Sequence, residues 1–199
     1  MLKYSSQIKV TPYLYKELKL AAKLKLKGFS STEIKDKSIK ENIFSMKTEQ
    51  RKREFASTVT RRLDSLDDYL LDKVVNSDLE TSKQIALYSI LKTDLLFFEF
   101  MKEVYKDKIL LKDYKLTDKD FNTFFQRKSE QSERVASWSE YNFNSLKGVY
   151  KRILLQAGFI DRQGVEVNII PPVMKKELVE YLLEKGDRVY LEAMLGEIQ

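Results

Sequence analysis

Amide and basic side chains gather on one side of a stretch near the C-terminal end of the sequence. A helix is expected over residues 139–157, because apolar residues recur there at helical spacing and Gly158 follows as a stop. The opposite side of this helix carries Asn144, Ser145, Gly148, Arg152 and Gln156, with Lys147 and Lys151 at its edge. Amides and guanidinium groups hydrogen-bond with base edges in the major groove of DNA, and lysines bind phosphates. The pattern predicts a groove-reading helix.

Two groups of basic residues in the first third of the chain could bind phosphates. One group occupies a single sector of a helix expected to begin at Thr11 and Pro12 and to stop at Gly28, and consists of Lys16, Lys19, Lys23 and Lys27. The other lies largely off the apolar seam of a helix expected over residues 48–75, and consists of Arg51, Lys52, Arg61 and Arg62. The lysine group could equally be a solvated face. The arginines could instead form a structural ion-pair network with acidic residues at 64–72.

Three more basic residues flank the expected groove-reading helix. Arg127 and Lys128 precede it, and Arg162 follows it in a turn-like stretch between two short strands. Together with Asn144, Ser145, Lys147, Lys151 and Arg152, they complete the candidate DNA-binding set of this part of the chain. A lysine or arginine at such positions would contact the phosphate backbone and would position the helix.

Catalytic signatures are missing from the sequence. It contains no cysteine and no histidine, which removes thiolate nucleophiles, the commonest general base and most zinc sites. Asp94 and Glu99 are five residues apart, so on a helix their side chains would diverge by roughly 140°. The sequence has no glycine-rich phosphate loop, no serine-nucleophile elbow and no acidic cluster with nuclease spacing. We therefore expect no enzyme activity, metal, cofactor or small-molecule substrate.

Positive charge is concentrated at the beginning of the chain. The formal net charge is +6, but residues 1–62 hold 16 Lys and Arg against six Asp and Glu. Residues 63–126 hold nine against 13, and residues 127–199 hold 11 of each kind. Such an asymmetry favours a polyanionic partner.

The most apolar stretch is Ile85–Tyr105, which carries few charges on any side. A helix of this composition belongs in the centre of a domain, and its charges make it unsuitable as a membrane span. With no secretory signal either, the sequence predicts a cytoplasmic protein. The expected fold is mainly α, with a helical bundle packed on a long central helix over residues 1–115.

The remaining residues, 116–199, have the order of a winged helix-turn-helix. Helices are expected over 118–128, 129–139 and 139–157. A β-hairpin follows, in which Val165, Val167 and Ile169 alternate as in a strand. Two short helices, Lys175–Leu183 and Asp187–Leu195, close the chain. In such a domain, the longer helix enters the major groove and Arg162 lies at the tip of the wing.

Several segments also resemble a known family. They read ILKTDLLFFEFMKEVY before Lys106, DKDFNTFFQR at 118–127, SEQSERVASWS at 129–139 and VYKRILLQAGFI at 149–160. These segments are similar to the BrxA family of bacterial BREX phage-defence systems, and the resemblance covers nearly the whole chain. It implies a non-enzymatic component that binds nucleic acid, double-stranded DNA above all, and that works beside other BREX proteins.

Two other functions fit the same sequence. The N-terminal half also resembles the helical bundle of NusB-type antitermination proteins, which would imply RNA as the ligand. Alternatively, the chain is a protein-interaction subunit whose positive charge serves an acidic partner or solubility. Competition between duplex DNA and RNA separates the first alternative from DNA binding, and weak affinity for any nucleic acid would favour the second.

Overall fold

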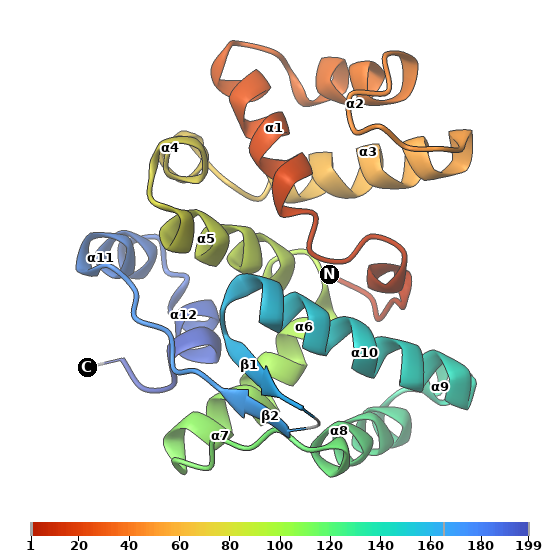
Figure 1. Ribbon diagram of the computed structural model, residues 1–199, viewed down its shortest axis with the longest axis vertical. Helices are drawn as coiled ribbons and strands as arrows, with labels where there is room; N and C mark the ends of the chain where they lie inside the picture. Colours follow the sequence, from red (N-terminus) through yellow and green to blue (C-terminus); the bar gives the residue numbers. More distant parts are fainter. Residues whose placement is uncertain (1, 165, 199) are drawn as a thin grey trace. The chain divides into compact units, whose positions relative to one another are not determined.

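Helices and one short β-hairpin form the secondary structure of the chain, as the sequence predicted (Figure 1). The computed structural model describes residues 2–164 and 166–198, so Val165 lies outside the described residues. The chain divides into two compact units. We call Val10–Thr93 the helical unit, and Met1–Lys9 with Asp94–Gln199 the hairpin unit. The division predicted between residues 115 and 116 falls inside the hairpin unit and stays a prediction.

The helical unit consists of five described helices with short connections. They are α1 (Tyr15–Leu26), α2 (Ser31–Lys40), α3 (Glu49–Leu63), α4 (Asp68–Asn76) and α5 (Leu79–Leu91). Ser30 and Glu33 form a capping box at α2, and the side chains of Thr48 and Asp78 cap α3 and α5. Each cap satisfies backbone N–H groups that the first helical turn leaves without partners.

The predicted start of the first helix at Thr11 and Pro12 is wrong. α1 begins at Tyr15, after Leu14 in a left-handed conformation with φ 52°. The reason lies in tertiary contacts. The Thr11 hydroxyl lies 3.1 Å from the Thr58 hydroxyl. The carbonyls of Thr11 and Tyr13 accept hydrogen bonds from Arg62. These contacts with α3 hold the segment outside a helix.

The prediction of a single helix over residues 48–75 is also wrong. α3 ends at Leu63, and the carboxylate of Asp67 accepts a hydrogen bond of 3.0 Å from Leu70 N to begin α4. An aspartate at this position favours a new helix start, because its short side chain satisfies a first-turn donor.

The long central helix is interrupted in the same way. α5 ends at Leu91, and Asp94 adopts an extended conformation and accepts a hydrogen bond of 2.9 Å from Phe97 N. The apolar stretch therefore continues as α6 (Leu95–Phe100), a π-helical turn η2 (Met101–Tyr105) and α7 (Lys106–Leu110). Most of its side chains are buried as predicted, but the break at Asp94 lies at the boundary between the two units.

The hairpin unit contains the remaining elements. They are the short 3-10 turn η1 (Gln7–Lys9), α8 (Asp118–Gln131), α9 (Glu133–Ala136), α10 (Glu140–Ala157), β1 (Ile160–Gln163), β2 (Glu166–Ile169), α11 (Lys176–Glu184) and α12 (Arg188–Leu195). The predicted middle helix is reduced to α9, because residues 129–131 continue α8. The two closing helices lie within one residue of their predicted bounds.

Aromatic side chains fix α8 and α10 against α6. The ring of Phe100 stacks on Phe121 at 4.8 Å, and Tyr150 contacts Phe97 edge-on at 4.8 Å. All four side chains are fully buried. Such aromatic pairs contribute about 0.5–1.5 kcal/mol each beyond the burial of their area. The inner face of α10 is thus held rigidly, which fixes the direction of its outer face.

A third extended segment pairs with the hairpin. β1 and β2 are antiparallel, with Ile160 opposite Ile169 and Gln163 opposite Glu166. On the other edge of β2, Leu116 N donates to Val167 O at 2.9 Å and Ile169 N donates to Tyr114 O at 2.7 Å. Residues 114–116 therefore lie along β2 and lead directly into α8.

No helix in the described part of the chain is long and apolar enough to cross a membrane.

Candidate nucleic-acid interface

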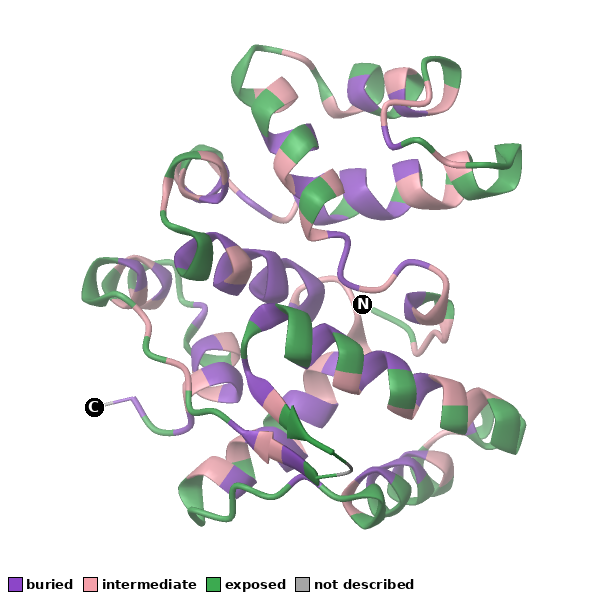
Figure 2. Ribbon diagram, in the orientation of Figure 1, coloured by how far each residue is buried: buried purple, intermediate pink, exposed green. Residues whose placement is uncertain are grey.

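α10 presents its predicted polar face outward. Ser139 caps its first turn, and Gly158 ends it with φ 84°, a conformation that glycine adopts without strain. Leu146, Tyr150 and Ile153 on the inner side are buried. On the outer side Asn144, Gly148, Arg152 and Gln156 are exposed, and Ser145, Lys147 and Lys151 are partly exposed (Figure 2).

The two lysines at the edge of α10 share one carboxylate. Lys151 Nζ lies 2.7 Å from Asp118 Oδ1, and Lys147 Nζ lies 3.4 Å from Asp118 Oδ2. The hydrogen bond from Lys151, with the charges of Lys151 and Lys147, lowers the pKa of the Asp118 carboxyl from its ordinary value. Asp118 therefore holds both ammonium groups beside the N-terminus of α8, on the side of α10 that faces the hairpin.

The hairpin and the extended segment beside it each add one cation to this region. Arg162 on β1 is exposed and donates from Nε to Gly164 O at 3.1 Å. Lys115, on the segment along the other edge of β2, forms an exposed ion pair of 3.2 Å with Glu166. Exposed ion pairs of this kind contribute little to stability, so Lys115 remains available to an anion, as does the exposed Arg162.

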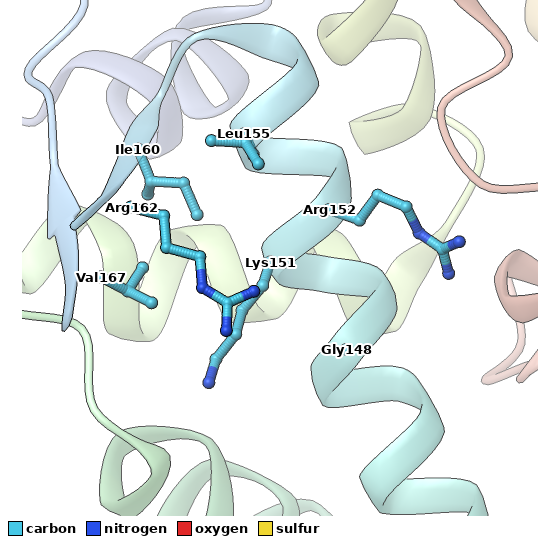
Figure 3. A pocket seen from close by; sticks show the side chains of 7 residues that line it. All are labelled: Gly148, Lys151, Arg152, Leu155, Ile160, Arg162 and Val167. Atoms are coloured by element: carbon cyan, nitrogen blue, oxygen red, sulfur yellow. The ribbon is translucent and has the colours of Figure 1, made fainter. Parts of the chain in front are cut away.

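Two adjoining hollows bring these residues together. The first, of about 450 Å³, is lined by Gly148, Lys151, Arg152, Leu155, Ile160, Arg162 and Val167. The second, of about 400 Å³, is lined by Lys115, Leu116, Thr117, Asp118, Lys151, Arg162, Glu166 and Val167. Figure 3 shows Lys151 and Arg162 reaching into the same opening from α10 and β1, while the guanidinium of Arg152 points away from them.

Lys128 does not belong to this surface. Its side chain is 3% exposed, and its ammonium lies 2.8 Å from Glu99 Oε2 and 2.5 Å from Glu103 Oε1. Arg127 beside it is exposed, at 3.9 Å from Glu103 Oε2. The structure thus gives Lys128 a structural role inside the hairpin unit and leaves Arg127 near the surface. Lys128 faces the π-helical turn and α6 rather than solvent.

In the helical unit, three lysines of α1 and its C-cap Lys27 form the predicted stripe. Lys16, Lys23 and Lys27 are exposed and Lys19 is partly exposed, with its ammonium 5.9 Å from the centre of the Tyr15 ring. Leu18, Ala21 and Ala22 on the opposite side are fully buried. The stripe is a cationic ridge along one helix.

The basic residues of α3 have two different environments. Arg62 is 2% exposed, and its guanidinium donates to Tyr13 O at 2.8 Å and to Thr11 O at 3.0 Å. Arg51 is exposed and donates to Val10 O at 3.0 Å, Lys52 pairs with Glu49, and Arg61 is exposed. Arg62 therefore positions the segment before α1, which its place in the sequence did not reveal.

Comparison with known proteins decides the family. Residues 2–186 match the sequence model of the BrxA family. The chain belongs to the BrxA family. The resemblance seen in the sequence is thereby confirmed.

A relative from Bacillus cereus (strain H3081.97), described as "BREX protein BrxA", is 48% identical over 194 residues. The alignment covers 98% of this chain and 97% of the relative. A crystal structure of an uncharacterized protein from Magnetospirillum magneticum has a TM-score of 0.82 at 19% identity, over 98% of this chain and 99% of that one. At this identity the likeness concerns the fold alone.

Two residues that sequence reasoning missed belong to the surface of this BrxA family chain. Lys115 lies on the extended segment beside β2, and Leu155 lines the first hollow from α10. The pairing of residues 114–116 with β2 joins positions about fifty residues apart, so no local pattern could place Lys115. Leu155 was not singled out by the sequence, because one further apolar residue on a helix carries no signal of its own.

Proposed function

We propose that this chain is a non-enzymatic, double-stranded-DNA-binding component of a BREX phage-exclusion system. The observation that carries the proposal is the outer face of α10. Asn144 and Arg152 are exposed there around Gly148, beside Lys151 and the hairpin residue Arg162. Amide and guanidinium groups on a helix can reach base edges in the major groove, and the flanking cations can contact phosphates.

The order of elements supports a winged helix-turn-helix in the hairpin unit. α6, η2 and α7 are followed by residues 114–116, α8, the short helix α9, α10, β1 and β2 in that order. In a domain of this kind α10 is the recognition helix, the hairpin is the wing, and residues 114–116 are the strand that completes a small sheet. Asp118 then orients Lys147 and Lys151 toward the side where a phosphate backbone would pass.

Backbone contacts from the helical unit would add affinity without adding sequence preference. The lysines of α1, with Arg51, Lys52 and Arg61 on α3, are candidates because their side chains reach the surface. Arg62 and Lys128 are left out of the proposed contacts because both are buried. The name of the Bacillus cereus relative supports a place in a BREX system, beside its other proteins.

Fluorescence anisotropy with a labelled blunt duplex tests the proposal. We expect Lys151→Ala/Arg152→Ala to bind roughly tenfold more weakly than wild type. Lys176→Ala/Lys185→Ala, at the first residue and the C-cap of α11, removes the same charge elsewhere in the hairpin unit, and we expect it to bind like wild type. Unlabelled RNA should compete less well than unlabelled duplex DNA.

Two outcomes would favour other functions. Stronger competition by RNA would favour an RNA-binding protein similar to the NusB type. No affinity for any nucleic acid near physiological salt would overturn the proposal and would favour a protein-interaction subunit of the defence system.

A further inference from the structure

The first hollow combines an apolar floor with a cationic rim. Its volume of about 450 Å³ falls in the range of roughly 300–1,000 Å³ that small-molecule sites occupy. It opens between the second half of α10 and the hairpin (Figure 3). A straight duplex needs contacts on the outer face of α10 but does not need a hollow beside that face. The hollow therefore requires a separate explanation.

Leu155 gives the hollow an exposed apolar surface. Its side chain is 46% exposed, whereas Ile160 and Val167 on the hairpin are 3% and 8% exposed. The three residues line the same hollow. A flat apolar group placed against Leu155 would cover surface that now faces water, and burial of such surface is favourable.

Positive charge lies at one side of this floor. Lys151 and Arg162 reach into the opening, whereas the guanidinium of Arg152, which also lines the hollow, points away from them. None of the described lining residues is acidic. The neighbouring hollow differs, because Asp118 and Glu166 line it together with its cations. An anion is therefore favoured at the rim of the first hollow more than at the second.

Gly148 has no side chain, so its backbone is accessible at the edge of the hollow. A Cβ added there would meet nothing within 4 Å, and the helix does not require a positive φ at this residue. Mid-helix glycine is less favourable than alanine, so the packing of the protein gives no reason for it. Glycine does allow a ligand to approach the backbone closely.

We infer that this hollow binds one unpaired nucleotide of a nucleic-acid strand. Lys151 and Arg162 hold its phosphate, its base covers Leu155, and its sugar passes Gly148. A base that is out of the stack can enter a pocket and pack against apolar side chains there. The inference rests on the proposed DNA binding by α10, which would bring a strand end or an extruded nucleotide to the hollow.

The first test compares a blunt duplex with the same duplex carrying one unpaired nucleotide at each 3′ end. We expect wild type to bind the extended duplex about tenfold more tightly. Leu155→Ser should lose the preference and bind the two duplexes equally well. Leu111→Ser is the matched control, because Leu111 is 78% exposed and does not line the hollow; it should keep the preference.

Gly148→Ala separates binding from folding. We expect its melting temperature to rise, because alanine favours the helix, while its preference for the extended duplex falls. A variant that loses the preference and is more stable than wild type cannot have lost it by unfolding.

The second test uses 2′-deoxyadenosine 5′-monophosphate as a probe in amide NMR spectra of the whole chain. We expect saturable shifts around Leu155 and Val167 in wild type, none in Leu155→Ser, and weaker shifts with inorganic phosphate. Equal affinity for both duplexes without these shifts would overturn the inference and leave the proposed DNA binding intact. Saturable shifts without duplex binding would support the nucleotide site and overturn the proposed function instead.

Discussion

Arg61 and Arg62 are neighbours on α3, but their side chains have different environments. Arg61 is exposed, whereas Arg62 is 2% exposed and donates hydrogen bonds to two backbone carbonyls before α1. The sequence grouped them together because both lie largely off the apolar seam of the helix. Which arginine turns inward depends on the path of residues 10–14, and no local pattern encodes that path.

The pair gives a prediction about stability. We expect Arg62→Ala to lower the free energy of unfolding by about 2–4 kcal/mol, because two carbonyls would lose charged donors inside the protein. Arg61→Ala should change it by less than about 0.5 kcal/mol, as surface substitutions usually do. Urea denaturation of both variants measures the difference. Equal losses would contradict the structural role of Arg62.

Lys128 is a second basic residue whose environment could not be predicted from its neighbours in the sequence. The sequence placed it beside Arg127 as a phosphate contact, yet it bridges Glu99 and Glu103 inside the hairpin unit. Those two carboxylates lie one helical turn apart in a stretch whose apolar character was recognised. Their partner lies about 25 residues away in sequence, on a different helix, and was not predicted.

At the scale of elements, a helix cap depends on fewer residues than the continuity of a long helix does. Ser30, Thr48 and Asp78 each cap their own first turn, so the interaction involves only a few neighbouring residues. The breaks at Asp67 and Asp94 were missed, because apolar residues continue at helical spacing on both sides of each break. An aspartate at each break could have indicated the start of a new helix. The longer periodic pattern of apolar residues favoured one continuous helix instead.

The N-terminal segment is held in position by contacts with residues that are far away in the sequence. Ile8 is 3% exposed, η1 packs on α10, and Lys9 donates a hydrogen bond to Asn142. Tyr4 donates from its hydroxyl to Glu99 Oε2 at 2.8 Å. Burial, and then the hydrogen bond to Glu99 and the charges of Glu99 and Glu103, raise the pKa of Tyr4 to about 12.

This attachment predicts a pH dependence. Because the pKa of Tyr4 is higher in the folded than in the unfolded chain, its contribution to stability is complete below about pH 10. It is lost as the pH rises from there to about 12. A difference titration of tyrosine absorbance between wild type and Tyr4→Phe should show one group ionising near pH 12. Ionisation near pH 10 would mean that the segment is not attached at Glu99.

At the scale of the whole molecule, the charge distribution favours a polyanionic partner, which stays a prediction, and it does not show which surface would bind that partner. Residues 1–62 hold most of the excess positive charge, and in the structure Lys16, Lys23 and Lys27 indeed reach solvent. The hairpin unit has little excess charge, yet it gathers Lys115, Lys151 and Arg162 around two hollows. Pairing of residues 114–116 with β2 creates that arrangement, and it is a property of the fold.

The central claim is that cations around α10 and the hairpin contact DNA phosphates, and the salt dependence of duplex binding tests it most directly. The slope of log affinity against log salt concentration becomes shallower by about 0.9 for each phosphate that the protein no longer neutralises. We expect Lys147→Ala/Lys151→Ala/Arg162→Ala to lower the slope by roughly two to three. The charge-matched control Lys102→Ala/Lys176→Ala/Lys185→Ala should keep the wild-type slope. An unchanged slope in the first variant, or a wild-type slope near zero, would contradict the account.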